Sequence, residues 1–420
     1  MEISSDPIAQ PRASGAAFKN HVILLLDMDC FFASVEQRNY PKTLAGKPIV
    51  VTDPPPSSVV SAASREAKDL VAKRCDTGEL PQGTKLEAGM SVADAQRICP
   101  GVVVAPPHPE EYRKVSCQIM EYIAGIVGGM DYLETKALDE AYIDATQVVG
   151  NHNNADENLK AGGELGKILK AQIFKKTGLH CTVGVGPSKN IAKIACEKGK
   201  PAWNKPASQV GVKVVLESEK VSFLRPESVT ALTGVGPVKA ETLANAGFQI
   251  VGHLQDFEGD LVAKVGKRIG YKLAGQLKSL ALGEDVIAVK HKYRQDSFQK
   301  QDTFKACTDL NKIKKLVLKL SEQLEEALKG QGDVAFCISV KAFYKSDDDD
   351  SKSKALDSPI AMGNEIYDAA MSLLNESDLL KKPVRKIVVR VSNLTPPGTV
   401  FKNKSEKAAG DQTLSLFNLP

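Results

Sequence analysis

Two neighbouring carboxylates, Asp139 and Glu140, stand at the front of a run of strand-forming residues that extends to Thr146. Aromatic and β-branched residues in this run favour a pleated, half-buried strand, and 132–137 is predicted as its hairpin partner. Acidic side chains at the end of a core strand are costly to bury unless their charge is compensated. A divalent cation is the usual compensation, because hard cations prefer carboxylate oxygens. The alternative interpretation of the acidic pair alone is a polar turn before a strand.

A second acidic stretch ends a continuous apolar run at His21–Asp29. Such runs are typical of strands buried on both faces. Residues 31–37 continue with helical spacing, so Asp27 and Asp29 lie at a strand-to-helix junction, where Asp29 could instead cap the helix. If the two acidic strands are neighbours in one sheet, Asp27 converges with the carboxylate pair. Three such groups form an oxygen-rich site suited to two Mg²⁺ ions and in-line phosphoryl transfer.

The two acidic stretches closely resemble motifs of the Y-family, or translesion, DNA polymerases. They are Asp-Met-Asp-Cys-Phe-Phe-Ala-Ser-Val-Glu-Gln at 27–37 and Leu-Asp-Glu-Ala-Tyr-Ile-Asp at 138–144. The resemblance covers residues 20–400, with a DinB/kappa-like Tyr-Arg-Lys-Val-Ser at 112–116 and an eta-like Cys-Phe-Phe in the first motif. It implies an α+β multidomain fold, a right-hand polymerase with a ferredoxin-like palm, small fingers, a helical helix–hairpin–helix thumb and an α/β little finger.

The resemblance also implies the chemistry, which is template-directed addition of dNTPs to a primer 3′-OH. It implies translesion synthesis of low fidelity, without proofreading. The expected catalytic residues are Asp27, Asp139 and Glu140. Together with the Met28 carbonyl they would hold two Mg²⁺ ions, with Mn²⁺ as an alternative. The expected partners are primer–template DNA and dNTPs, and the expected form is an intracellular monomer, nuclear in a eukaryote and cytoplasmic in a prokaryote.

Seven segments are expected along the chain. They are a flexible leader at 1–20, the first palm strand at 21–34, the fingers at 35–100, the remaining palm at 101–203, the thumb at 204–289, the little finger at 290–394 and a flexible tail at 395–420.

Contacts to the incoming nucleotide follow from the resemblance. Phe32 lies five residues after Asp27, where family members carry an aromatic ring beneath the deoxyribose. In the fingers, Arg65 and Lys68 occupy the places of the Tyr and Arg in the family's Tyr-Glu-Ala-Arg. Both are cationic donors for phosphate, but Lys does not reproduce a guanidinium fork, and a plain surface helix is the alternative. The expected nucleotide-binding residues are Cys30, Phe31, Phe32, Arg65, Lys68 and Lys200.

The segment 232–243, Leu-Thr-Gly-Val-Gly-Pro-Val-Lys-Ala-Glu-Thr-Leu, predicts a helix, a tight turn and a second helix. Its two glycines allow a turn whose backbone N–H groups point outward to a DNA phosphate. This helix–hairpin–helix pattern is expected in the thumb, with Gly234, Gly236 and Lys239 at the DNA. An ordinary turn between two helices is the alternative.

The C-terminal third is predicted to form a separate α/β domain. After a basic linker at 290–302, helix and strand patterns alternate in a βαββαβ-like order, and 347–350 is predicted to be an acidic loop. The predicted elements are Leu310–Lys329, Val334–Tyr344, Gly363–Leu374 and Val384–Val391.

Composition narrows the other possibilities. A chain of 420 residues with 42% hydrophobic content is long enough for two to four packed domains. The formal net charge is +4, and residues 290–420 hold 22 Lys and Arg against 18 Asp and Glu. This small surplus gives modest support to a polyanionic partner there. Eight scattered Cys without a C-x-x-C pair predict free thiols in a reducing compartment, and no apolar run approaches the length of a membrane span.

The last segment, from Asp411 to Pro420, regains apolar character after a lysine-rich stretch. Short apolar motifs in flexible tails commonly insert into a partner's pocket. This one resembles sliding-clamp-binding peptides, and it is closer to the bacterial clamp pattern with one residue inserted. Docking on the protein itself and disorder are the alternatives. The expected clamp-binding residues are Gln412, Leu414, Leu416 and Phe417.

Two other functions fit part of the sequence. Nucleotidyl cyclases share a two-metal palm, but they would not explain the helix–hairpin–helix or the basic C-terminal domain. A catalytically weak, DNA-bound scaffold that recruits other polymerases is the second alternative, because Arg65 and Lys68 depart from the family pattern.

Overall fold

The computed structural model describes residues 21–53, 59–150, 152, 154–200, 211–285, 288–290, 295–346, 348–376 and 378–398. The chain divides into two compact units, residues 1–292 and 293–420. The expected leader at 1–20 and most of the expected tail lie outside the described residues. Within these described ranges, no helix has both the length and the apolar character that a membrane span requires.

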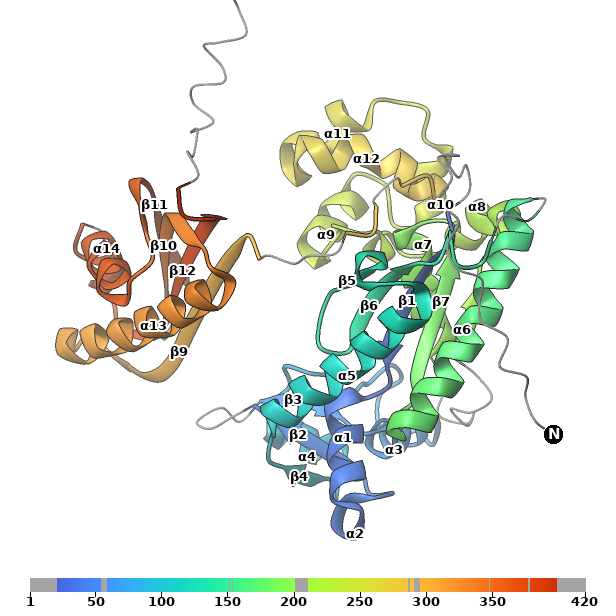
Figure 1. Ribbon diagram of the computed structural model, residues 1–420, viewed down its shortest axis with the longest axis horizontal. Helices are drawn as coiled ribbons and strands as arrows, with labels where there is room; N and C mark the ends of the chain where they lie inside the picture. Colours follow the sequence, from blue (N-terminus) through green and yellow to red (C-terminus); the bar gives the residue numbers. More distant parts are fainter. Residues whose placement is uncertain are drawn as a thin grey trace, which may run out of the picture. The chain divides into compact units, whose positions relative to one another are not determined.

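A five-stranded sheet forms the centre of the first unit (Figure 1). Its strands and two of its helices are β1 (Ile23–Met28), α5 (Pro109–Val127), β5 (Leu133–Thr135), β6 (Glu140–Asp144), α6 (Ala155–Thr177), β7 (Cys181–Gly186) and β8 (Val212–Val214). The strand order is β5-β6-β1-β7-β8, with β1 antiparallel to both of its neighbours and β8 parallel to β7. The first four of these strands, with α5 and α6 as crossovers, follow the βαββαβ path of a ferredoxin-like fold. The predicted palm architecture is confirmed.

Alternate residues of β1 enter two different layers of the core, which explains the continuous apolar run. Leu24 and Leu26 face α5 and α6 and are fully buried there. Ile23 and Leu25 face the opposite layer, where α7 (Lys189–Gly199) packs through Ala192 and Cys196. Because both faces of this strand are buried, its sequence does not alternate between apolar and polar residues.

A smaller α/β layer precedes α5 in the chain. After α1 (Phe31–Asn39) and α2 (Pro41–Leu44), a three-stranded sheet has the order β3-β2-β4 and its own apolar core. Its elements are β2 (Ile49–Thr52), β3 (Val60–Ala63), α3 (Arg65–Asp76), α4 (Val92–Ile98) and β4 (Val103–Ala105).

Helices follow the palm sheet and pack around a further apolar core that includes Leu243, Leu254 and Leu277. The turn at 233–236 meets α7, because the Asn190 side-chain oxygen accepts hydrogen bonds from the backbone N–H and hydroxyl of Thr233, at 2.9 and 3.0 Å. The helices are α8 (Lys220–Leu224), α9 (Pro237–Asn245), α10 (Val251–Asp256), α11 (Leu261–Ile269) and α12 (Tyr271–Leu282).

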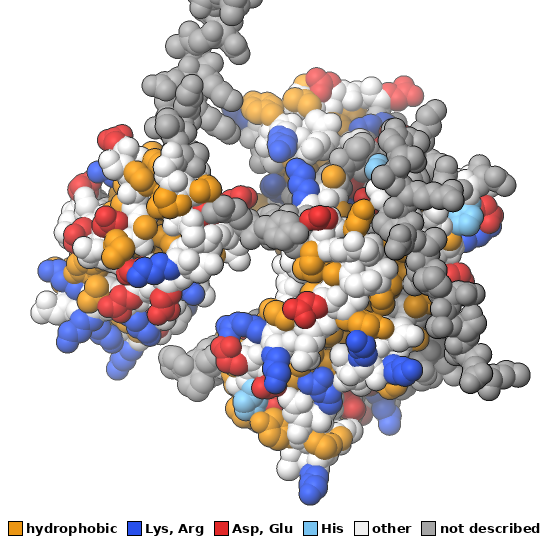
Figure 2. All heavy atoms as spheres, viewed as in Figure 1, with side chains coloured by type: hydrophobic (Ala, Val, Ile, Leu, Met, Phe, Trp, Pro, Cys, Tyr) orange, Lys and Arg blue, Asp and Glu red, His pale blue; other side chains and the backbone are white. Residues whose placement is uncertain are grey.

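The second unit is one antiparallel sheet with two helices, as predicted for the C-terminal third (Figure 1). The strand order is β11-β10-β12-β9, and both helices pack on the core through apolar side chains such as Leu324 and Leu374. The elements are β9 (Ser297–Cys307), α13 (Leu310–Gln331), β10 (Val334–Tyr344), β11 (Asp349–Ile360), α14 (Gly363–Asn375) and β12 (Val384–Thr395). Figure 2 shows Lys and Arg side chains gathered over the first half of α13, where Lys312, Lys314 and Lys315 are exposed.

Two local predictions are wrong. Residues 297–302 belong to strand β9 and not to a linker, because half-buried and exposed positions alternate there while the inward set includes the polar Lys300 and Asp302. Asp349 and Asp350 open β11 instead of remaining in an acidic loop, since Asp349 pairs with Phe343 of β10. Helix α6 begins at Ala155, where the Asn154 side chain accepts the Glu157 N–H and caps the helix.

Gly184 provides a test of the contact between β7 and α7. A Cβ at this position would lie 2.0 Å from the Ala192 carbonyl oxygen and 2.2 Å from the Cys196 nitrogen, both backbone atoms. We therefore expect Gly184→Ala to lower the free energy of unfolding by about 3 kcal/mol or more. The matched control is Gly125→Ala in α5, whose Cβ would meet nothing within 4 Å and which should stabilise by about 0.5–1 kcal/mol. Circular-dichroism melts of both full-length variants measure the difference, and equal melts would contradict the proposed close contact.

Candidate active site

The sheet brings the two acidic stretches together. Asp27 at the end of β1 is paired with Glu140 at the start of β6 in the antiparallel register. The Met28 N–H donates to the Asp139 carbonyl oxygen at 2.9 Å, which joins the last residue of β1 to the residue just ahead of β6. The two segments are more than a hundred residues apart in the chain, and the pairing of β1 with β6 makes them neighbours.

A cleft of about 1130 Å³ opens beside these acids, between the palm sheet and the small α/β layer. Asp27, Met28 and Asp139 line it, whereas Glu140 is half-buried and adjoins it through its pairing with Asp27. All of the expected nucleotide-binding residues line the same cleft, namely Cys30, Phe31, Phe32, Arg65, Lys68 and Lys200. The structure thus brings together residues from four separate parts of the sequence.

Burial raises the pKa of Asp27 to about 6 from its ordinary value of 3.8. The Lys200 ammonium, 3.3 Å from the Asp27 carboxylate, opposes this shift, and the charge of Asp139 adds to it. Burial also raises the pKa of Asp139 and that of Glu140. Although burial works against the charge of Lys200 itself, the carboxylates of Asp27 and Glu197 raise its pKa. The three acids therefore form a half-buried, under-compensated set of oxygen donors.

This donor set fits a hard divalent cation. Carboxylate oxygens and a backbone carbonyl are the ligands that Mg²⁺ takes, and a positive charge would remove the penalty that raises the three pKa values. In the described ranges, no group of three or more His, Cys, Asp or Glu residues is already placed so that its side chains could hold a metal ion. Asp27, Asp139, Glu140 and the Met28 carbonyl are the groups through which this edge of the sheet could hold metal.

The junction between β1 and α1 gives the adjacent rings of Phe31 and Phe32 different surroundings. Cys30 adopts a left-handed backbone conformation, with φ at 52°, at the N-cap of α1. After this sharp turn Phe31 enters the palm core at 3% exposure, while Phe32 is half-buried and stacks on Tyr112 of α5. The two ring centroids of that stack are 4.4 Å apart.

Two cationic side chains in the first turn of α3 line the cleft. Ser64 caps this helix, its side chain accepting the Ala67 N–H, and Arg65 and Lys68 follow directly. Arg65 pairs with Asp69 at 2.7 Å on the next turn. Lys68 lies close enough to Cys30 to oppose the rise in the pKa of that thiol that burial causes. The N-terminus of a helix is itself favourable for anions, so this side of the cleft is suited to phosphate groups.

Asp29 does not cap α1. Its Oδ1 accepts a hydrogen bond from the Thr182 hydroxyl at 2.7 Å, and its backbone N–H donates to the His180 carbonyl. Its Oδ2 is buried without a hydrogen-bond partner among the residues that the structure describes. Asp29 therefore ties the β1–α1 junction to β7.

The segment predicted as a helix–hairpin–helix contains a tight turn ahead of α9, and a three-residue 3₁₀ helix, Val229–Ala231, precedes the turn. Gly234 has φ at 88°, a conformation that favours glycine, and Gly236 precedes α9 as its N-cap. The Lys239 ammonium donates to the Gly234 carbonyl oxygen at 3.2 Å and closes the turn. Val235 is buried beneath it, and Gly234 and Gly236 are exposed. The segment 412–417, with its expected clamp contacts, lies outside the described residues.

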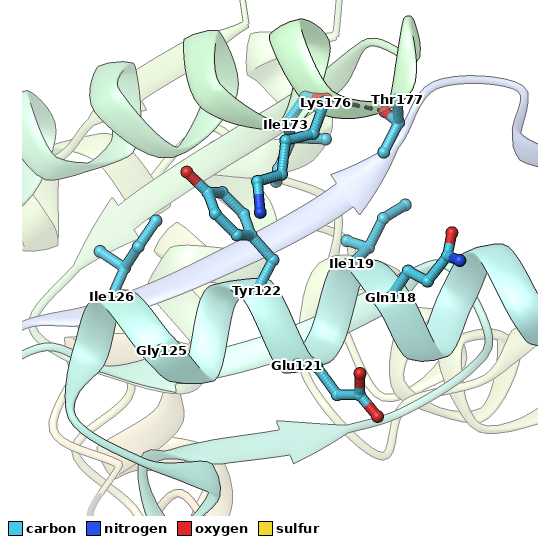
Figure 3. A pocket seen from close by; sticks show the side chains of 9 residues that line it. All are labelled: Gln118, Ile119, Glu121, Tyr122, Gly125, Ile126, Ile173, Lys176 and Thr177. Carbon is cyan, nitrogen blue, oxygen red and sulfur yellow. Dashed lines mark hydrogen bonds between the residues drawn. The ribbon is translucent and has the colours of Figure 1, made fainter.

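A second hollow, of about 680 Å³, lies between α5 and α6 (Figure 3). Tyr122, Ile126 and Ile173 line it, and the Lys176 ammonium sits 3.9 Å from the centre of the Tyr122 ring. It contains a single carboxylate, Glu121, so it lacks the convergent acids that the cleft beside β1 provides.

Sequence reasoning missed a buried polar cluster beside Phe32. Glu36 is 1% exposed and contacts both Tyr112 and His108, two residues of the region where α5 begins. In the sequence, Tyr112 stands out only as part of the DinB/kappa-like Tyr-Arg-Lys-Val-Ser motif. The signal that could have revealed this cluster is Glu36 itself, a charged residue among apolar positions on the inner face of α1.

A palm sheet with paired acids at its edge is the arrangement expected of an enzyme that transfers phosphoryl groups. Residues 26–80 and 82–197 match the model of the impB/mucB/samB family, and residues 295–403 match that of its C-terminal domain. A DNA polymerase IV of Leptospira interrogans is 31% identical over 84% of this chain and 88% of its own. A DNA polymerase IV of Neisseria meningitidis is 37% identical over 64% of this chain, and the match spans 66% of that relative's length.

Solved structures agree with the sequence relatives. A Y-family DNA polymerase chimera built on Dbh matches with a TM-score of 0.72 and 28% identity, covering 89% of this chain and 99% of its own. DinB from Sulfolobus solfataricus matches over the same shares with a TM-score of 0.56 and 27% identity. The chain belongs to the Y family of DNA-directed DNA polymerases, the translesion polymerases, as the resemblance implied.

The pKa of Asp27 predicts how metal-free stability depends on pH. An acid whose pKa rises on folding, here from 3.8 to about 6, binds protons more strongly in the folded state, so the free energy of unfolding falls as the pH rises through that window and stays lower above it. We expect Asp27→Asn to lack this loss and to be more stable than the wild type at pH 7.5 in EDTA, by about 1–3 kcal/mol. Thermal melts from pH 4 to pH 8 measure it.

The control for this experiment is Glu121→Gln, which neutralises an exposed carboxylate on α5. It should reproduce the wild-type pH profile. An Asp27→Asn profile parallel to that of the wild type would contradict the burial penalty assigned to Asp27.

Proposed function

We propose that this chain extends a primer 3′-OH with dNTPs, directed by a template, through Asp27, Asp139 and Glu140. The observation that carries the proposal is the pairing of β1 with β6, which sets these acids at the edge of a cleft also lined by Arg65, Lys68 and Lys200. Family membership supports the specialisation for translesion synthesis. Low fidelity without proofreading is part of the same proposal.

Asp27, Asp139, Glu140 and the Met28 carbonyl would hold two Mg²⁺ ions, and Mn²⁺ is the alternative ion. When bound, such ions lower the pKa of the primer hydroxyl and stabilise the negative charge that develops on the transferred and leaving phosphates. The burial of the three acids supports this role, because each gains stability when a cation compensates its charge. Lys200, already beside Asp27, supplies a mobile point charge for the triphosphate.

The incoming dNTP would lie between the acids and α3. Arg65 and Lys68 at the first turn of that helix would contact its phosphates, along with the backbone around Cys30 and Phe31. Phe32 lines the cleft beside these groups, and we assign its ring to the position beneath the deoxyribose. A ribonucleotide would bring its 2′-OH against that ring.

Primer–template DNA would contact both units. In the first unit, the exposed Gly234 and Gly236 offer backbone N–H groups to a phosphate, with Lys239 beside them. In the second unit, the sheet face opposite the helices is polar and partly cationic, a character suited to phosphate contacts. Its members on the central strands include Ser339, Lys341, Phe343, Lys386 and Arg390.

Primer extension with each dNTP tests the function. We expect Asp139→Ala to lower the extension rate by at least about a thousandfold, because removing a ligand of catalytic metal removes stabilisation that is needed in the transition state. Primer–template affinity, measured by fluorescence anisotropy, should stay within about threefold, since the acid would hold metal rather than DNA. Asp131→Ala, an exposed aspartate ahead of the same hairpin, is the matched control.

Each alternative has its own outcome in this assay. Near-normal extension by Asp139→Ala would overturn the assignment of the acids. A wild type that binds primer–template but extends nothing would favour the DNA-bound scaffold, and cyclisation of a nucleoside triphosphate without primer would favour a cyclase.

We also propose that Gln412, Leu414, Leu416 and Phe417 bind a sliding clamp, and that the chain acts as an intracellular monomer. Tethering to a clamp raises the effective concentration of the polymerase at the primer end. Deletion of 411–420 should therefore abolish stimulation of synthesis by the cognate clamp, on the order of tenfold or more, and leave clamp-free extension unchanged. Leu416→Ala with Phe417→Ala is a smaller change that should act in the same direction. Full stimulation of the deleted protein would refute clamp binding through this segment.

A further inference from the structure

The proposed function does not explain Glu36, a buried charged residue of the first unit. Glu36 lies on α1 at 1% exposure and makes no contact with the acids of the active site among the contacts that the structure describes. Its Oε1 accepts a hydrogen bond from the Tyr112 hydroxyl. The His108 Nδ1 lies 2.9 Å from Oε1 and 3.1 Å from Oε2. Burying a carboxylate in this way is costly unless hydrogen bonds compensate its charge.

The contact between α1 and the start of α5 has a regular geometry. Phe32 and Glu36 are four residues apart, so they lie on one face of α1. His108 and Tyr112 have the same spacing at the start of α5. Tyr112 is therefore held at two points of its side chain, since its ring stacks on Phe32 at an angle of 14° and its hydroxyl reaches Glu36. Its ring cannot slide along Phe32 without pulling the hydroxyl away from its acceptor.

The Tyr112 side chain has little freedom to leave this position. It is 2% exposed, and a buried hydroxyl that loses its acceptor bears the full desolvation cost. Burial, with the hydrogen bond to Glu36, raises the pKa of Tyr112, so the hydroxyl stays protonated and donates. His108 holds the other side of the same carboxylate and is more open to solvent, at 39% side-chain exposure.

We propose that Glu36 is a positioning residue for sugar discrimination, which fixes Tyr112 so that the Tyr112 ring backs Phe32 against the sugar of the incoming nucleotide. This inference rests on the proposed place of Phe32 beneath the deoxyribose. A ribonucleotide differs from a deoxyribonucleotide by one oxygen, so a small retreat of the Phe32 ring is enough to admit it. A dNTP has no 2′-oxygen to contact the Phe32 ring, so its incorporation does not depend on the exact position of that ring.

The variants are chosen to remove the hydroxyl–carboxylate contact with little change in volume. Tyr112→Phe keeps the stacked ring and deletes one oxygen, whereas Glu36→Leu deletes the acceptor and Glu36→Gln retains one. The matched control is Tyr122→Phe, also on α5, which deletes the hydroxyl that donates to Gln172 at 3.2 Å beside the hollow between α5 and α6 (Figure 3). Single-turnover kinetics of the full chain with dNTP and rNTP give kcat/KM for each.

We expect Tyr112→Phe and Glu36→Leu to raise kcat/KM for rNTP by about tenfold, the factor that corresponds to one hydrogen bond to a charged group. The value for dNTP should stay within about twofold. Glu36→Gln should retain most of the discrimination, and Tyr122→Phe all of it. A purely structural role would lower both values together, or would lower the melting temperature with no change in their ratio, and either result would overturn the proposal.

Phe32→Ala separates this inference from the one it rests on. If Phe32→Ala weakens discrimination against rNTP but Tyr112→Phe does not, the proposed role of Glu36 is wrong. The proposed place of the Phe32 ring beneath the deoxyribose would then still hold. If Phe32→Ala leaves the dNTP to rNTP ratio unchanged, the proposed place of Phe32 fails first. In the Phe32→Ala background, Glu36→Leu should cause no further loss of discrimination between dNTP and rNTP, because the ring that Tyr112 supports is gone. A further loss of discrimination of similar size would also overturn the proposal.

Discussion

The antiparallel pairing of β1 with β6 is the constraint on which the rest of the active site depends. It places Asp27 opposite Glu140 and joins Met28 to Asp139 through a backbone hydrogen bond. Backbone pairing is directional and its register is strict, since a slip of one residue would turn every side chain to the other face. The buried Leu24 and Leu26 on one face, and Ile23 and Leu25 on the other, hold that register. Apolar packing on two layers thus determines where the acids stand.

The cost of this arrangement is electrostatic. Three carboxylates are drawn out of water at one sheet edge, and burial raises the pKa of each. Lys200 offsets only part of that cost, because its ammonium is shared between Asp27 and Glu197. A site of this kind is less stable than its surroundings until a cation enters, and it is the scaffold of buried strands that keeps it in place.

The sequence predicted the acidic triad and the palm because both depend on strong local signals. A continuous apolar run and an acidic pair before a strand are visible without a structure, and the family resemblance supplied their order in the sheet. Glu36 could not be recognised in the same way, since its partners His108 and Tyr112 are 72 and 76 residues away and helical spacing does not identify them. Strand β9 was mistaken for a linker because Lys300 and Asp302, on its inward face, are polar.

The position of Phe32 at the start of α1 explains why its ring needs support from Tyr112 and Glu36. The ring stands on the second residue of α1, directly after the left-handed turn at Cys30, where the helix has few hydrogen bonds of its own to hold it. The remainder of α1 is anchored by apolar contacts to the palm core, through Ala33 and Val35. Packing alone tolerates small slides of one ring over another, whereas a hydrogen bond to a buried carboxylate has a defined length and direction. Glu36 and Tyr112 thus add a directional hydrogen bond to the apolar contact between the Phe32 and Tyr112 rings.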